Sequence, residues 1–303
     1  LASEIKEVTL NFPTPKEQTK IAEFLSAVDD KISQLSRQLE LLNQYKKGVM
    51  QKIFSQEIRF KNDNGEDFGE WEEVPLNQIA SKVTVKNRGN KVTEVLTNSA
   101  TQGIIKQSDF FDREIVSESN INGYYVVEVD DFVYNPRIST TAPVGPIKRN
   151  KLGRTGVMSP LYYIFQTHDI DNTFLETYFS TRYWHQFMKL NGDSGARADR
   201  FAIKDAVLKE MPIPYPANEE QQCIGVFFKQ VDNIIILHQR KLAHLQAKKK
   251  CLLQKMFPKK GERFPELRFP GFTGEWEKGK LEDLGEIMTG STPSTKKKEY
   301  YAE

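Results

Sequence analysis

The feature of this sequence that most constrains its fold is a long segment that occurs twice. Residues 17–54 align without a gap on residues 220–257, and 15 of the 38 aligned positions are identical. An internal repeat of this size usually means that one structural unit has been used twice. The chain therefore contains two equivalent elements, and the distance between them is the length of a domain.

Both copies have the residue pattern of a long helix in a coiled coil. Their apolar residues recur at alternating steps of four and three, which gives a helix one buried seam. We expect helices at residues 17–57 and 217–257 that pack as an antiparallel pair, although helices of another subunit could cover the same seams. The predicted seam residues are Ile21, Leu25, Val28, Ile32, Leu39 and Leu42 in the first helix and Ile224, Phe228, Val231, Ile235, Leu242 and Leu245 in the second.

The segment between the helices has the size and pattern of one complete domain. Short β-favouring runs, at residues 91–96, 123–129 and 160–165, are separated by Gly, Asn, Asp and Pro. One helix is predicted over residues 172–190. We therefore expect an α+β domain at residues 58–216, flanked by the two long helices.

The two ends of the chain look like parts of a second domain of the same kind. Phe12-Pro13 matches Tyr215-Pro216 ahead of the helices, and the Gly-Glu-Trp-Glu sequence at residues 69–72 recurs at residues 274–277. Residues 1–12 look like the last strand of such a domain, and residues 276–303 look like the first elements of another. The chain also starts without Met, so we expect a fragment or a rearranged reading frame.

Composition indicates a soluble globular protein of about two domains. Of the 303 residues, 38% are hydrophobic, and 43 Lys and Arg nearly balance 41 Asp and Glu. No run approaches the roughly 18 apolar residues of a spanning helix, and the N-terminus lacks a signal-peptide pattern, so a cytoplasmic protein is expected. Cys223 and Cys251 belong to no CxxC motif, so neither a disulfide framework nor a metal site is expected.

The motifs of enzymes that act on DNA are missing from this sequence. Asn135-Pro136-Arg137 lacks the second proline of the methyltransferase motif Asn-Pro-Pro-aromatic. Asp130-Asp131 is followed by no Glu-x-Lys signature of a metal-dependent nuclease, and residues 290–295 lack the Gly-Lys-Ser/Thr of a phosphate-binding loop. We therefore expect no catalytic residue and a non-enzymatic role.

Basic and polar residues gather in three loops of the middle domain. One loop has four basic residues within seven positions and no acid among them, which fits phosphate contacts and a solvated loop equally well; three such loops on one small domain favour DNA binding. The other two carry Asn and Arg side chains that can bind the edges of adenine and guanine. The residues expected to contact bases are Asn135, Arg137, Arg197 and Arg200, and those expected to contact phosphates are Lys148, Arg149, Lys151 and Arg154.

These segments together resemble the specificity subunit of type I restriction-modification systems. The segments Pro13–Ala22 and Pro216–Ile224 are similar to the family's entry into its two helices, and the similarity is specific because it occurs twice at domain spacing. Residues 134–138 and 195–201 are similar to parts of the family's target recognition domains. The resemblance extends over nearly the whole chain, but residues 264–272 look like the beginning of such a subunit and yet follow the second helix. The resemblance therefore implies a circularly permuted or truncated order, in which residues 1–16 are the end and residues 258–303 the beginning of a second target recognition domain.

The resemblance implies two target recognition domains, each binding one half of a split double-stranded DNA site. The helices would set their separation and bind modification (methyltransferase) subunits and, through these, restriction (nuclease-translocase) subunits. S-adenosylmethionine, ATP and Mg²⁺ are then expected on those partners and not on this chain. A second copy of the chain could supply the other domain, and no membrane partner is expected. The alternatives are the recognition part of a fused methyltransferase-nuclease and a coiled-coil cassette that binds no DNA.

Overall fold

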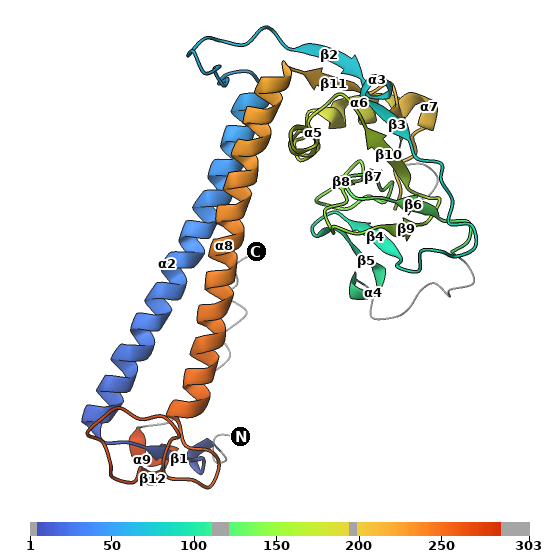
Figure 1. Ribbon diagram of the computed structural model, residues 1–303. Helices are drawn as coiled ribbons and strands as arrows, with labels where there is room; N and C mark the ends of the chain where they lie inside the picture. The colour runs from blue at the N-terminus through green and yellow to red at the C-terminus, as the bar shows by residue number, and fades with distance from the viewer. Residues whose placement is uncertain (1–4, 111–120, 194–198, 286–303) are drawn as a thin grey trace, which may run out of the picture. The chain divides into compact units, whose positions relative to one another are not determined.

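The computed structural model describes residues 5–110, 121–193 and 199–285, and Arg197 therefore lies outside the described residues. The chain divides into two units, and Figure 1 labels the helices and strands of both. The central unit is Leu42–Ile234, and the terminal unit combines Leu1–Leu41 with Ile235–Glu303. None of the described helices has a stretch that is long and apolar enough to cross a membrane.

The two repeated segments form the helices α2 (Pro15–Phe54) and α8 (Asn218–Met256), each of which contributes to both units. Proline is favoured at the first position of a helix, and α2 accordingly starts at Pro15. That helix ends three residues before the expected position 57, and Gln56 has a left-handed φ of 58°. All predicted seam residues are buried or half-buried, as a helix pair requires.

Equivalent ion pairs join the two helices inside each unit. In the central unit Lys46 Nζ lies 2.6 Å from Asp232 Oδ1, and in the terminal unit Lys249 Nζ lies 2.5 Å from Asp29 Oδ1. The residues of one pair correspond to those of the other at the repeat offset. A higher residue number in α2 pairs with a lower residue number in α8, so the two helices are antiparallel. The expected intramolecular pair is thus confirmed.

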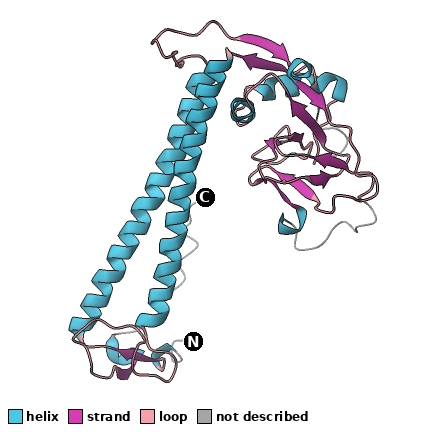
Figure 2. Ribbon diagram, in the orientation of Figure 1, coloured by secondary structure: helices cyan, strands magenta, loops and turns pink. Residues whose placement is uncertain are grey.

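The central unit confirms the predicted α+β class (Figure 2). Its largest sheet has four antiparallel strands in the order β3 (Ala80–Lys82), β10 (Tyr163–Thr167), β7 (Phe132–Tyr134) and β8 (Ile147–Arg149). The further strand pairs among its described residues are β2 (Glu72–Pro75) with β11 (Pro212–Tyr215), β4 (Leu96–Ser99) with β5 (Gly103–Lys106), and β6 (Tyr125–Val127) with β9 (Gly156–Met158). The short helices are α3 (Leu76–Ile79), α4 (Gln107–Phe110), α5 (Asn172–Phe179), α6 (Trp184–Asn191) and α7 (Asp205–Leu208).

Aromatic side chains bind the end of α2 to this domain. Phe54 lies 5.7 Å from Phe174 and 6.0 Å from Trp71 between ring centroids, and its side chain is part of the same buried cluster as the sheet. Phe132 and Phe165 stack on neighbouring strands at 5.4 Å. Buried aromatic rings contribute large apolar areas, so the last turns of α2 belong to the core of the central unit.

The single helix predicted over residues 172–190 is wrong, because the chain turns between α5 and α6. Thr181 Oγ1 donates a hydrogen bond to the Tyr178 carbonyl at 2.6 Å, and Trp184 Nε1 donates to the Phe179 carbonyl at 3.2 Å. These side chains satisfy the terminal carbonyls of α5 and so end the helix. The first turn is capped by Asp171, whose Oδ1 accepts from the N–H of Thr173 and Phe174.

The strand predicted at residues 91–96 is also misplaced, since β4 begins at Leu96. Asn87 holds the preceding residues in a loop: its Nδ2 donates to the Val92 carbonyl at 2.8 Å and its Oδ1 accepts from the Val92 N–H at 3.0 Å. An Asn that bonds nearby backbone offers the chain an alternative to a strand ladder.

Helix α8 passes close to the capped end of α5 at Gly225. A Cβ at this position would lie 2.7 Å from Asp171 Oδ1, whereas a Cβ on Gly48 of α2 would meet nothing within 4 Å. We expect Gly225→Ala to lower the free energy of unfolding by about 1 kcal/mol, because overpacking outweighs the gain in helix propensity. Gly48→Ala is the matched control and should raise it by about 0.5–1 kcal/mol. Urea unfolding measures the free energy of unfolding of both variants. A higher value for both would contradict the close approach of α8 and α5 at Gly225.

The terminal unit repeats the strand junction of the central unit. Strand β1 (Thr9–Phe12) pairs antiparallel with β12 (Glu277–Lys280), and Phe12 faces Glu277 as Tyr215 faces Glu72 in the pair β11–β2. The short helix α9 (Leu281–Leu284) follows β12 as α3 follows β2. Trp276, just before β12, is buried with Ile21 and Met256 of the long helices.

Candidate nucleic-acid interface

A buried carboxylate fixes the α+β domain of the central unit to helix α8. Glu220 is fully buried and accepts from Arg59 Nε at 3.0 Å, Arg59 Nη2 at 2.6 Å and Trp71 Nε1 at 2.9 Å. The next residue, Gln221, donates to the Pro216 carbonyl at 2.9 Å and accepts from the Asp171 N–H at 2.8 Å. The Glu-Gln pair that marks each repeat is therefore a structural joint between helix and domain.

The same joint occurs in the terminal unit. Arg268 donates from Nε and Nη2 to the two carboxylate oxygens of Glu17, both at 2.7 Å, and Gln18 donates to the Pro13 carbonyl at 2.8 Å. The Arg268 Nη1 group also donates to the Gly274 carbonyl, as Arg59 donates to that of Gly69. The repeat therefore preserves side-chain contacts as well as helices.

Three of the residues predicted to contact bases line one hollow of the central unit. Asn135, Arg137 and Arg200 border a cavity of about 520 Å³, which we call the recognition hollow. The backbones of Arg137 and Arg200 form an antiparallel bridge, although the residues are far apart in sequence. Tyr124 and Tyr162 also line the hollow.

Asn135 shapes the loop that carries Arg137. Its Nδ2 donates to the Asn98 carbonyl at 2.9 Å, and its Oδ1 accepts from the Arg137 N–H at 3.0 Å. Both ends of the amide are thus engaged with backbone, which differs from the free amide that bidentate adenine contacts need. In this structure Asn135 holds the backbone of Arg137 in place.

Arg137 has the geometry of a side chain that is free to bind a ligand. It is 60% exposed, and among the described residues the carboxylate that it pairs with is that of Asp199, at 3.8 Å. A pair so long and so exposed contributes little to stability. Arg200 is half-buried in the same wall. The recognition hollow therefore combines planar guanidinium groups with aromatic side chains.

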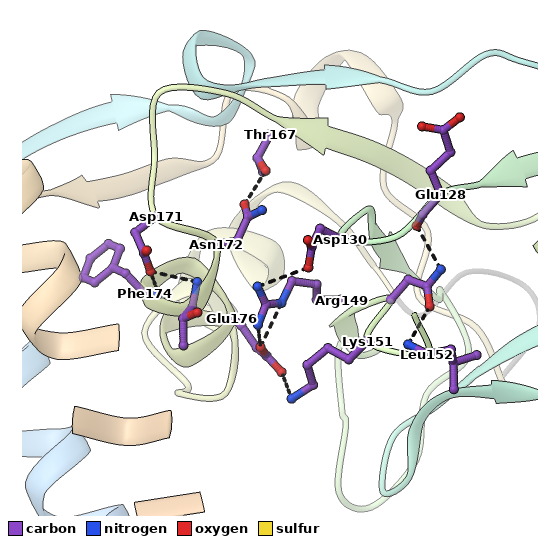
Figure 3. Close-up of polar contacts among 12 residues, drawn as sticks. Glu128, Asp130, Arg149, Lys151, Leu152, Thr167, Asp171, Asn172, Phe174 and Glu176 are labelled. Carbon is purple, nitrogen blue, oxygen red and sulfur yellow. Dashed lines mark hydrogen bonds and ion pairs between the residues drawn. The ribbon is translucent and has the colours of Figure 1, made fainter. Parts of the chain in front are cut away.

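Three of the four basic residues at positions 148–154, which the sequence predicts to contact phosphates, are paired with carboxylates in the structure. Glu176 of α5 accepts from Arg149 Nη2 at 2.7 Å on one oxygen and from Lys151 Nζ at 2.5 Å on the other, and Arg149 also pairs with Asp130 (Figure 3). Arg154 makes two hydrogen bonds of 2.7 Å to Glu94. The acids come from distant parts of the sequence, so local composition could not reveal them.

Lys148 differs from the rest of that cluster. It is half-buried on β8, and no carboxylate of the described residues lies within ion-pair distance of it. Burial lowers the pKa of its ammonium group from the usual value, and the charge of Glu176 partly offsets the effect. Within the described residues, no group of His, Cys, Asp and Glu side chains could hold a metal ion.

Comparisons with known proteins agree with these features. A family model described as the type I restriction modification DNA specificity domain matches residues 69–247. The type I restriction enzyme MjaVIII specificity subunit of Methanocaldococcus jannaschii is 28% identical over 82% of this chain, and the putative MjaX specificity subunit of the same organism is 26% identical over 83%. The chain spans 61% and 59% of the length of these two relatives.

Solved structures give more distant similarities. The HsdS subunit of Thermoanaerobacter tengcongensis aligns at a TM-score of 0.44 and 16% identity, over 80% of this chain and 58% of that one. The type I restriction-modification S subunit of M. genitalium aligns at 0.49 and 15% identity, over 81% of this chain and 62% of that one.

Proposed function

We propose, since this chain belongs to the family of type I restriction-modification DNA specificity domains, that its central unit recognises a sequence in double-stranded DNA. The observation that carries this proposal is the meeting of Arg137 and Arg200 at the recognition hollow. An exposed guanidinium presents paired donors that fit the O6 and N7 acceptors of guanine in the major groove. Arg197 remains a predicted base contact, and Asn135 would act by holding Arg137.

The chain would act as a non-catalytic specificity subunit in the cytoplasm. Modification subunits would bind the helix pair, and restriction subunits would join through them; S-adenosylmethionine, ATP and Mg²⁺ would bind to these partners. Apolar residues of α2 and α8 that lie off the seam between the helices are exposed in the terminal unit, which supports a protein partner. They are Leu41, Ile236 and Leu237, and they are 47%, 42% and 62% exposed.

We also propose that residues 1–16 and 258–303 are the end and the beginning of a second target recognition domain. The described part of the terminal unit leaves a set of apolar side chains 40% to 53% exposed, whereas the equivalent side chains of the central unit are at most 2% exposed. The exposed residues are Ile5, Val8, Leu10 and Leu284, and their equivalents are Leu208, Met211, Ile213 and Ile79. Such a surface fits the body of a domain like the central one, from this chain or a second copy.

Methylation mapping tests the function directly. The chain is expressed in cells with its modification subunit, and methylated bases are mapped by single-molecule sequencing; we expect a two-part motif. Purified chain with the modification subunit should also bind duplex DNA in a salt-dependent manner. Failure to bind any duplex would support a coiled-coil scaffold instead. A longer reading frame with Asn-Pro-Pro-aromatic would support the fused methyltransferase-nuclease.

A further inference from the structure

A second hollow of the central unit adjoins the recognition hollow. Its volume is about 860 Å³, and Ala100, Thr141 and Pro146 line both cavities. The last turns of α2, strand β8 and the link between α5 and α6 form its walls. Tyr183 Oη donates to the Gln51 carbonyl at 3.2 Å, which ties two of these walls together. We call it the basic hollow.

The basic hollow contains more positive than negative charge. Lys47 of α2, Lys148 of β8 and Arg182 before α6 line it, and no carboxylate of the described residues lies within ion-pair distance of any of them. The one carboxylate of the lining, Glu57, is paired with Lys52 at 2.7 Å. Three cations from three separate elements therefore face one cavity without a compensating acid.

The surroundings of Lys148 make this excess unusual. A lysine ammonium group that is withdrawn from water normally has an ionic partner. Glu176 is the nearby acid, yet its two oxygens already accept from Arg149 and Lys151. His185, which also lines the hollow, has its pKa lowered to about 4 by burial and by the charges of Arg182 and Lys189. The imidazole is thus neutral at pH 7 and can donate one N–H bond.

The position of the basic hollow indicates which anion it would bind. A side chain that contacts base edges does so in a groove about 12 Å wide, so a neighbouring surface of the protein meets the phosphates that border the groove. The basic hollow shares a wall with the recognition hollow and so has that position. We propose that Lys47, Lys148 and Arg182 bind the phosphodiester backbone of DNA whose bases contact the recognition hollow. The inference rests on the proposed function.

These proposed phosphate contacts differ from the ones predicted from the local sequence. Arg149, Lys151 and Arg154 are held by Glu176, Asp130 and Glu94, whereas the proposed phosphate contacts include Lys47, a residue of the helix pair. The end of α2 would then have two roles, because it packs into the core of the central unit and also contacts DNA. The affinity for a duplex bound in this way would depend directly on the position of the last turns of α2.

The test is the salt dependence of duplex binding by a triple variant, Lys47→Gln, Lys148→Gln and Arg182→Gln, in the full chain with its modification subunit. Each lost phosphate contact lowers the slope of log affinity against log salt by about 0.9 on B-DNA. The slope should therefore fall by about 2.7, so that between about 50 and 200 mM salt the wild type loses roughly 40-fold more affinity than the variant. The loss should be equal on target and non-target duplexes.

The matched control replaces three exposed lysines of the same unit that do not line the basic hollow: Lys86→Gln, Lys209→Gln and Lys229→Gln. It changes the net charge by the same amount and should leave the slope almost unaltered. Equal slopes for the two triple variants would overturn the inference while leaving DNA recognition intact. A wild type that binds no duplex would instead overturn the proposed function.

Two further outcomes would assign the hollow to another ligand and overturn the inference. One is loss of modification-subunit binding with unchanged duplex binding by the free chain, which indicates an acidic protein surface. The other is micromolar binding of inorganic phosphate in calorimetry without DNA. If the triple variant unfolds, Lys47→Glu alone replaces it: Lys47 is exposed on α2, and reversal of its charge should weaken all duplexes more than Lys229→Glu does.

Discussion

Arg59→Ala should lower the free energy of unfolding of the central unit by about 3–5 kcal/mol, since it leaves a buried carboxylate without its cationic partner. Glu220 is fully buried, and the side chain of Arg59 is only 19% exposed. After the substitution, Trp71 Nε1 is the one remaining described side-chain donor to that carboxylate. An unpaired buried charge costs far more than a lost surface ion pair.

The measurement is urea unfolding of the full chain, followed by tryptophan fluorescence. Arg37→Ala is the control, because Arg37 pairs with Glu40 at 2.6 Å on the surface, where the side chains are 62% and 54% exposed. It should cost less than about 1 kcal/mol. If both variants lose the same amount, Glu220 does not depend on Arg59 and the joint has another basis. Arg268→Ala should produce a loss like that of Arg59→Ala in the terminal unit, because Glu17 is just as buried.

The helix pair could be predicted from sequence because its pattern is local and repeated. The heptad spacing predicts the apolar seam residues, all of which are buried or half-buried, and Lys46 and Lys249 occupy equivalent positions of the repeat. Lys46 and Lys249 pair with Asp232 and Asp29 of the opposite helix, and the aspartates stand at equivalent repeat positions too. Two independent regularities in the sequence thus converge on one antiparallel register.

The recognition loops could be predicted only in part, because their electrostatics depend on residues far away in sequence. Glu176 is 27 residues from Arg149, and Glu94 is 60 residues from Arg154. A count of charges along the loop therefore overestimated its positive field. The basic hollow was missed for the same reason, since Lys47, Lys148 and Arg182 come from three elements that only tertiary structure brings together. Sequence did identify Arg137 and Arg200 separately, without indicating that they meet.

Arg137→Ala should weaken binding to the cognate duplex by about 1–3 kcal/mol and relax the preference for one base pair, because a bidentate arginine contact discriminates by this amount. Arg137 is exposed, lines the recognition hollow and holds Asp199 only at 3.8 Å. The substitution therefore breaks no buried contact of the described residues, and the fold should be unaffected. Competition binding measures the affinity and the base preference; the competitors are duplexes with the motif from methylation mapping and with every single-base variant of it.

Arg137→Lys separates base recognition from charge. Lysine keeps the positive charge but lacks the planar fork, so this variant should bind non-cognate duplexes like the wild type and still lose discrimination at one base pair. Arg88→Ala is the matched control, since Arg88 is exposed on the same unit and lines none of the hollows. A uniform loss on every duplex for Arg137→Ala, with full discrimination by Arg137→Lys, would make Arg137 a phosphate contact. Base recognition would then depend on Arg200 and on the tyrosines of the hollow.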